Sequence, residues 1–185
     1  MRPFEPKARH CEVCHTLYTP QRMGQVVCRP ACAMKKVRLE KVAERAQIKT
    51  RKEAIKTIPD LIKEAQHAFN AFVRARDSAK PCICCGRTQE AGYGTAAHGW
   101  DCGHYRSTGS ASHLRFNEDN AHRQLVICNR HGAGRAVDYR RGLINRIGLE
   151  RVEALEASNT PHKWTREELI GIRDHYRKLL KETPA

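Results

Sequence analysis

The sequence predicts an α+β protein with an N-terminal zinc finger of the treble-clef or ribbon type, a basic helical arm, and a second module of short strands and C-terminal helices. Three observations support this. Four cysteines form two close pairs near the N-terminus, a segment without Gly or Pro follows them, and a centre rich in His, Cys and Gly precedes further helical periodicity. The expected boundaries are residues 1–34 for the finger, 35–79 for the arm and 80–185 for the second module.

Composition narrows the class of protein. The chain has 185 residues, with 34 Lys and Arg against 20 Asp and Glu, a formal net charge of +14. Such an excess favours a polyanionic partner, either nucleic acid or an anionic membrane. Only 6% of the residues are aromatic, so small modules held by metal are expected rather than one large core. The sequence contains no apolar run of membrane-spanning length and no signal-peptide pattern, so we expect a cytoplasmic protein.

The first four cysteines have the spacing of a zinc site. Cys11 and Cys14 form a Cys-x2-Cys pair, and Cys28 and Cys32 form a Cys-x3-Cys pair after a hairpin-like stretch, residues 15–27. Nine cysteines in a reducing compartment are more readily zinc ligands than disulfides. Each pair, held in a tight turn, supplies two corners of a tetrahedron. We therefore expect a four-thiolate zinc finger here.

Two helical segments of different character follow. Residues 33–57 lack Gly and Pro, and basic residues recur all round the expected helix. This arm can be a solvated spacer or a surface that contacts DNA phosphates; the sequence leaves both open. In residues 58–79, Pro59 and Asp60 suit the first turn of a helix, and apolar residues then recur at helical spacing. We therefore expect one face of this helix to pack against another part of the protein. The apolar positions are Leu61, Ile62, Ala65, Ala68, Phe69, Phe72 and Val73.

The C-terminal third predicts three further helices. Residues 135–158 predict a helix, a break at Gly148 and a second helix. A last helix begins at Thr165, whose hydroxyl can cap the helix while Glu168 reaches back, as in a capping box. We expect these helices to form the core of the second module.

The centre of the chain collects groups that suit phosphodiester hydrolysis. Asp101, His104, Asn120 and Asn129 stand in "WDCGHYRS", "NEDN" and "VICN". A neutral His near pH 7 can accept a proton from water, and carboxylate and amide oxygens suit a hard divalent cation that neutralises phosphate charge. The set therefore indicates a metal-dependent hydrolase.

These motifs, in this order, resemble the HNH, or ββα-metal, nuclease family. Over nearly the whole chain, the sequence is similar to the NinG (Rap) family of lambdoid phage recombination proteins, through "NAFVRARD", "PCICCG", "WDCGHYRS", "LRFNEDN", "VICN", "LINRIG" and "HKWT". The resemblance implies an endodeoxyribonuclease in the host cytoplasm that cuts branched DNA, such as Holliday junctions and D-loops, leaving 5′-phosphate and 3′-hydroxyl ends. Two symmetric cuts in a four-way junction imply a homodimer.

The same resemblance assigns roles to residues. His104 would activate water, Asp101 and Asn129 would hold Mg²⁺ or Mn²⁺, and Asn120 would brace the loop after His104. One departure concerns Asp101: in many HNH enzymes the Asp directly precedes the His, whereas here two residues intervene.

The second departure concerns a second zinc site. Cys82, Cys85 and Cys128 match the family's knuckle, but Leu125 stands where a further thiolate is expected. Three outcomes stay open: His131 completes a Cys₃His site, another cysteine (Cys84 or Cys102) substitutes, or apolar packing around Leu125 replaces the metal.

Five arginines surround this centre in the sequence, and as a group they suit phosphate contacts through the guanidinium fork. They are Arg106, Arg115, Arg123, Arg130 and Arg135.

Two other functions remain as alternatives to a branched-DNA endonuclease. One is a zinc-containing DNA-binding protein of recombination or transcription without catalysis, and the other is a sequence-specific or generally degradative HNH nuclease.

Overall fold

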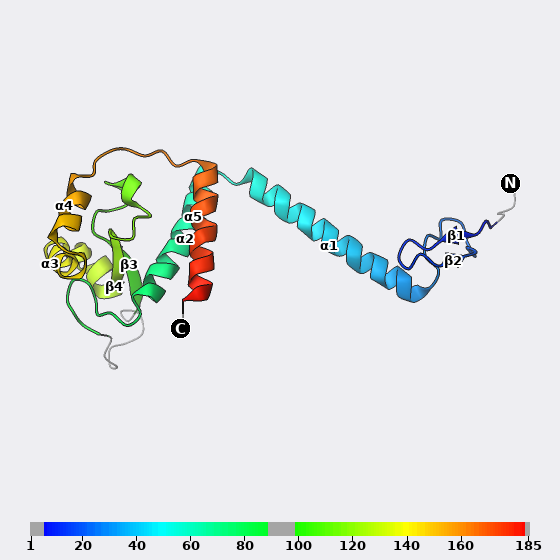
Figure 1. The fold of residues 1–185 in the computed structure, drawn as a ribbon, viewed down its shortest axis with the longest axis horizontal. Coiled ribbons are helices and arrows are strands. Elements are labelled where there is room, and N and C mark those ends of the chain that lie inside the picture. Colours follow the sequence, from blue (N-terminus) through cyan, green and yellow to red (C-terminus); the bar gives the residue numbers. More distant parts are fainter. Residues whose placement is uncertain (1–5, 89–98, 184–185) are drawn as a thin grey trace. The chain divides into compact units, whose positions relative to one another are not determined.

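The computed structural model describes residues 6–88 and 99–183, and the chain divides into two compact units, Met1–Lys56 and Thr57–Ala185 (Figure 1). The helix of residues 58–76 packs inside the second unit, so the boundary expected at residue 79 is corrected to residue 56. Among the described residues, every helix is too short or too polar to cross a membrane.

The first unit begins with a small antiparallel pair of strands. β1 (Arg9–His10) and β2 (Leu17–Tyr18) frame the turn that carries the first cysteine pair. A hairpin was expected between the two cysteine pairs, but residues 19–27 form no strand. The paired strands instead flank the first cysteine pair. Residues 19–27 fold back through a hydrogen bond from the Tyr18 hydroxyl to the Gln25 carbonyl, at 2.6 Å.

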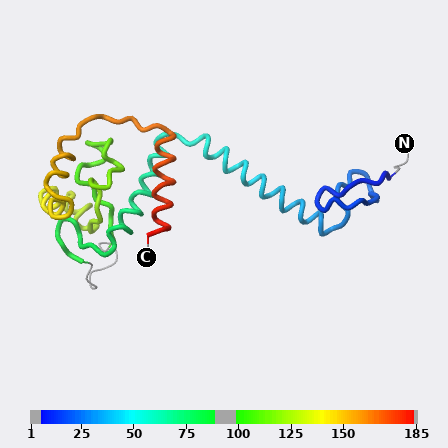
Figure 2. Tube along the Cα trace, viewed as in Figure 1, coloured from blue at the N-terminus to red at the C-terminus, as the bar shows by residue number. Residues whose placement is uncertain are grey.

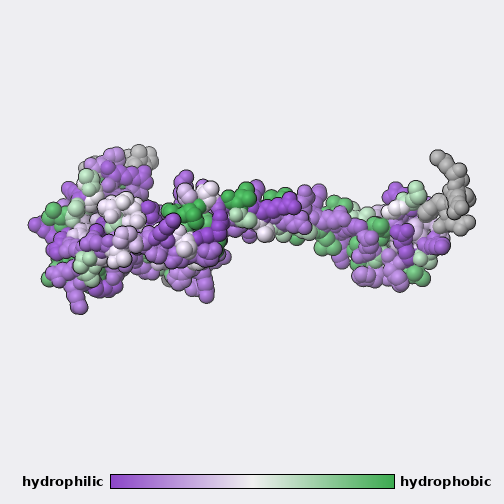
Figure 3. Space-filling model, turned by 90° about the horizontal axis from the view of Figure 1, so that it is seen from above, coloured by the Kyte–Doolittle hydropathy of each residue, from purple (hydrophilic) through white to green (hydrophobic). Residues whose placement is uncertain are grey.

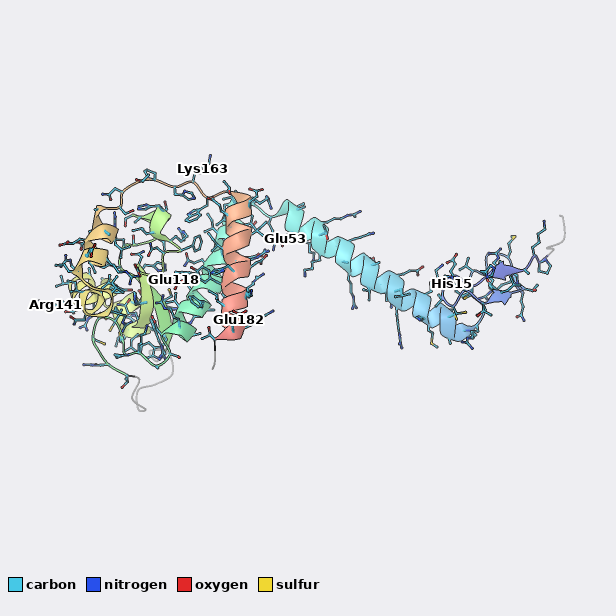
Figure 4. All side chains as sticks on the ribbon, viewed as in Figure 1. His15, Glu53, Glu118, Arg141, Lys163 and Glu182 are labelled. Carbon is cyan, nitrogen blue, oxygen red and sulfur yellow. The ribbon has the colours of Figure 1, made fainter. Side chains whose placement is uncertain are left out.

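Helix α1 (Pro30–Ile55) forms the rest of the first unit. It begins at a proline, whose fixed φ suits the first helical turn. Of its side chains only Cys32 is buried, and eight Lys or Arg against three Glu line its length. Both hydrophobic and hydrophilic residues are exposed along it (Figure 3), and its side chains project outward from the ribbon (Figure 4). The expectation that this helix buries little by itself is confirmed. Its large exposed apolar residues are Met34, Val37, Leu39, Val42, Ile48 and Ile55.

In the second unit, α2 (Ile58–Arg76) packs along α5 (Arg166–Glu182). Both helices begin with a capping box, in which Thr57 pairs with Asp60 and Thr165 pairs with Glu168. The second of these boxes was predicted and is confirmed. The helices bury their apolar faces in one core, centred on Phe69, which makes an edge-to-face contact with Tyr176 at 4.9 Å between centroids.

A hairpin stands next to this core. β3 (Trp100–His104) pairs antiparallel with β4 (Ala121–Leu125), with Asp101 opposite Gln124 and Gly103 opposite His122. Alternate residues point to opposite faces of such a hairpin. Cys102 and Ala121 face the α2–α5 core, so Asp101 and Gly103 face the other side. The loop between the strands contains a short 3₁₀ turn, η1 (Ser112–Leu114).

Helices α3 (Ala136–Ile147) and α4 (Leu149–Ala157) cover the other side of the hairpin (Figure 1). Their apolar residues form a second core with Ile83, Ala111 and Leu114. Gly148, at φ +89°, makes the predicted break between the two helices. From α4 the chain crosses back to α5 (Figure 2), pinned on the way by Trp164, whose ring packs edge-on against Phe116. Two short turns, η2 (Ile127–His131) and η3 (Ala133–Arg135), join β4 to α3.

Candidate functional site

The prediction that the four N-terminal cysteines converge is confirmed. The sulfur atoms of Cys11, Cys14, Cys28 and Cys32 all lie within 4.8 Å of one another, with 3.4 Å between Cys14 and Cys28. Four thiolates bound to zinc at about 2.3 Å stand about 3.8 Å apart, so this group fits the ion. Burial raises the pKa of Cys11, but backbone N–H donors, including that of Val13, outweigh burial and lower this pKa to about 6.

A second group of four sulfur atoms lies in the other unit. Cys82, Cys84, Cys85 and Cys128 are all within 4.8 Å of one another, with 3.6 Å from Cys82 to Cys84 and from Cys85 to Cys128. This spacing again fits a tetrahedral zinc site. Among the three outcomes left open by the sequence, Cys84 completes the group. His131, one of the candidate ligands, is exposed and lies outside the group.

The turn at the start of this knuckle explains the choice of Cys84. The Gly86 N–H bonds back to the Cys82 carbonyl at 3.0 Å, and Gly86 adopts φ +68°, which favours glycine. The chain therefore doubles back within five residues, and both Cys84 and Cys85 face Cys128.

Leu125 has no thiolate to offer a metal, but its backbone supports the cysteine group. Its N–H donates to the Cys82 sulfur at 3.3 Å, while its side chain packs in a small apolar cluster beside Trp100. The neighbouring Gln124 amide donates to the Cys84 sulfur, also at 3.3 Å. The hydrogen bond of the Cys84 thiol, followed by backbone N–H donors that include Leu125, outweighs burial and lowers the pKa of Cys82 to about 4. The knuckle is thus fastened directly to β4.

On β3, Asp101 meets the residues that directly follow Cys128. The Asn129 amide donates to Asp101 Oδ2 at 3.0 Å, and Arg130 binds both carboxylate oxygens, Nε to Oδ2 and Nη2 to Oδ1, each at 2.8 Å. The hydrogen bonds of Arg130, followed by that of Asn129, keep the pKa of Asp101 below its ordinary value. A carboxylate and a side-chain amide carry oxygen donors of the kind that Mg²⁺ or Mn²⁺ binds.

The structure does not bring His104 to this pair. Asp101 and His104 stand three positions apart on β3, so their side chains point to opposite faces, with about 10 Å of strand between them. The His104 ring packs near Phe69, at 6.0 Å between centroids, and its Nε2 lies 3.1 Å from the Arg115 carbonyl oxygen. Burial lowers the pKa of His104, which keeps the imidazole neutral near pH 7.

Asn120 is fully buried and holds the loop that follows His104. Its Oδ1 accepts from the Arg106 N–H at 2.8 Å, and its Nδ2 donates to the carbonyls of Arg106 and Leu114 at 3.0 and 3.1 Å. These three hydrogen bonds hold together the two ends of the loop between β3 and β4.

Four of the five arginines expected to contact phosphate make contacts inside the protein. Arg106 donates to the Leu155 carbonyl at 2.9 Å and to the Ser158 carbonyl, so it caps the C-terminal end of α4. Arg135 is exposed, and the thiolates of Cys128 and Cys84 raise its pKa. The remaining contacts join Arg115 to Gln66 and Thr108, Arg123 to Ser78 and the Trp100 ring, and Arg130 to Asp101.

Sequence reasoning overlooked Asp77, a fully buried carboxylate at the end of α2. It accepts from Arg76 at 2.8 Å, from Lys80 at 2.9 Å and from the Arg123 backbone N–H at 3.2 Å, and so ties α2 to β4. Burial opposes its ionisation, but these donors hold the pKa of Asp77 well below its ordinary value. The signal in the sequence was a lone acid between basic residues at a helix end.

His122 on β4 was also left unassigned. It is 3% exposed, and its Nδ1 has no hydrogen-bond partner within the described part of the chain. Burial lowers the pKa of His122 to about 3. Glu118, labelled in Figure 4, lies in the loop just before β4. Its carboxylate accepts hydrogen bonds from Arg76 and from the Tyr176 hydroxyl, both at 3.3 Å.

Comparisons with known proteins cover both units. The model of one protein family, described as "NinG: Bacteriophage Lambda NinG protein", matches residues 4–184. Protein ninG of Escherichia phage lambda is 39% identical over 199 residues, which covers 96% of this chain and 94% of that protein. Protein ninG of Salmonella phage P22 is 39% identical over 195 residues, covering 94% of this chain and 93% of that protein. No solved structure matches the chain.

Proposed function

The chain belongs to the NinG family of bacteriophage proteins, and on that premise we propose that it is a metal-dependent DNA endonuclease of phage recombination that cuts branched intermediates such as Holliday junctions and D-loops. The formal net charge of +14 supports a DNA partner. The two groups of four cysteines support a protein that is built from small zinc-held modules.

The observation that carries the proposal is the contact between Asp101 and Asn129 at 3.0 Å, beside the cysteine group of the second unit. Asp101 comes from β3 and Asn129 from the turn after β4, so the hairpin brings together two oxygen-bearing side chains that are far apart in sequence. These residues would hold Mg²⁺ or Mn²⁺. The bound ion would neutralise the negative charge that develops on a phosphate during attack by water.

The remaining roles follow from the chain itself. A neutral His104 can accept a proton, and Asn120 keeps the loop after it in one conformation through its bonds to Arg106. Because Arg106, Arg115 and Arg123 are engaged within the protein, we assign most phosphate contacts to the exposed Lys and Arg of α1.

One observation favours a second function, DNA binding without catalysis. His104 faces away from Asp101, and its Nε2 is held at the Arg115 carbonyl. If that position persists on DNA, the imidazole cannot reach a phosphate beside Asp101.

Cleavage of defined DNA separates these functions. The zinc-loaded protein is incubated with a four-way junction or a linear duplex of equal length, with Mg²⁺, Mn²⁺ or EDTA. Three variants run in parallel: His104→Ala, Asp101→Asn and, as a matched control, the exposed His67→Ala on α2. The proposal expects cleavage of the junction by wild type and His67→Ala only. Binding without cleavage under every ion establishes the non-catalytic function, and equal cleavage of both DNAs removes the preference for branches.

A further inference from the structure

We propose that Arg130 is a displaceable latch on Asp101. In the cation-free protein its guanidinium holds the carboxylate, and when a divalent cation binds there the guanidinium is released toward the DNA phosphate. This inference rests on the proposed function and adds to it a residue that controls when the cation site is available.

The contact has the form expected of a cation substitute. Arg130 binds both oxygens of Asp101 in a bidentate fork, at 2.8 Å each, while the Asn129 amide binds one of the same oxygens at 3.0 Å. The Asp101 side chain is 16% exposed, and the guanidinium and the amide bind its carboxylate oxygens. A positive charge therefore occupies the oxygens that a hard cation needs, and the two cannot bind them together.

The latch is also free to open. The Arg130 side chain is 65% exposed, and ion pairs of such residues contribute little to stability, so displacement is not strongly opposed. Both Asn129 and Arg130 belong to the short turn η2, directly after Cys128. Side-chain rotation of Arg130 releases Asp101 without moving the backbone of the cysteine group. The same rotation frees a fork of N–H donors beside the cation, where a phosphate oxygen would lie.

Direct measurement of cation binding tests the latch. Mn²⁺ is titrated into the zinc-loaded full chain without DNA, and free Mn²⁺ is followed by electron paramagnetic resonance. The proteins are wild type, Arg130→Gln, Asp101→Asn and the double variant. Arg141→Gln is the matched control, because it removes the same charge from α3 at a side chain that is 77% exposed.

The latch predicts that Arg130→Gln binds Mn²⁺ about five- to tenfold more tightly than wild type, since one competing charge is gone. Arg141→Gln stays within twofold of wild type, and Asp101→Asn removes this binding in both backgrounds. Equal affinity of wild type and Arg130→Gln, with binding that still depends on Asp101, overturns the latch and leaves the cation site intact. Absence of Asp101-dependent binding in every protein overturns the latch together with that site, whereas the cleavage assay judges the nuclease function separately.

Discussion

The side-chain amide of Asn120 binds the backbone of Arg106 on both sides, accepting its N–H at 2.8 Å and donating to its carbonyl at 3.0 Å. The two residues stand at opposite ends of the loop between β3 and β4. Arg106 in turn reaches the last carbonyls of α4. One buried amide therefore connects the hairpin, its loop and a helix of the second core.

Replacement of Asn120 by Ala should lower the free energy of unfolding by about 2–4 kcal/mol, because backbone groups of Arg106 and Leu114 lose their partners. Urea denaturation of the full chain measures this change. The control is Asn159→Ala, since Asn159 is exposed and also bonds Arg106. A loss below 1 kcal/mol at position 120 would show that the loop does not depend on this amide.

Zinc stoichiometry distinguishes Cys84 from His131 as the fourth ligand. Native mass spectrometry should find two zinc ions in the wild type and one tightly bound ion in Cys84→Ser, since the second tetrahedron then lacks a corner. His131→Ala and Cys102→Ala should each retain two ions. Loss of zinc from His131→Ala with retention in Cys84→Ser would contradict the grouping of sulfur atoms described above.

Stability should decrease on mild acidification because of His122. Its pKa is lowered to about 3 in the folded chain, whereas in the unfolded chain it titrates near 6.5. Protons therefore bind the unfolded state first as the pH falls below 6.5, and between pH 6.5 and 5 the free energy of unfolding drops by about 2 kcal/mol. Chemical denaturation at several pH values measures how the free energy of unfolding changes with pH. In His122→Gln this dependence should correspond to about one bound proton fewer than in the wild type. The matched control is His67→Gln, at an exposed histidine on α2.

Gly142 on α3 allows the helix to touch the cysteine knuckle. A Cβ at this position would lie 1.8 Å from the Ile83 carbonyl oxygen, so Gly142→Ala should destabilise the second unit by about 2–4 kcal/mol and weaken zinc binding there. Gly171 on α5 has nothing within 4 Å of that position, and Gly171→Ala should instead stabilise by up to about 1 kcal/mol. Thermal unfolding followed by circular dichroism compares the two, and destabilisation of equal size would refute the steric explanation.

The salt dependence of DNA binding tests the role of α1. Changing Lys49, Arg51 and Lys52 together to Gln should reduce the slope of log affinity against log salt by about 2–3, since each phosphate contact contributes about 0.9. The matched control changes Arg177, Lys178 and Lys181 on α5, which are also exposed and carry the same charge. Fluorescence anisotropy with a junction measures both. Equal slopes for the two triple variants would mean that α1 has no special part in binding.

Local rules predicted the helices well. The capping pair of Thr165 and Glu168, the break at Gly148 and the apolar face of α2 depend on neighbours in the sequence, and all three are present in the structure. The domain boundary was harder, because α2 follows the basic arm without any linker signal. Its membership of the second unit depends on contact with α5, about a hundred residues later.

The site shows where local reasoning fails. Spacing alone could not choose among Cys84, Cys102 and His131, because the choice depends on how the Cys82–Gly86 turn folds back. The arginines look alike in sequence, yet the guanidinium of Arg106 serves the carbonyls of α4. The opposite orientation of Asp101 and His104, however, follows from the two-residue period of a strand and was available from the sequence once the strand was assigned.

The cysteine group of the second unit joins Cys85 to Cys128, 43 positions apart. A bound ion there would act as a crosslink that shrinks the denatured ensemble, and the entropy of closing such a loop grows only with the logarithm of its length, about 0.6 kcal/mol for each doubling. A change in the length of a connection outside β3 and β4 would therefore alter this entropy little, whereas the positions of the four sulfur atoms must be kept.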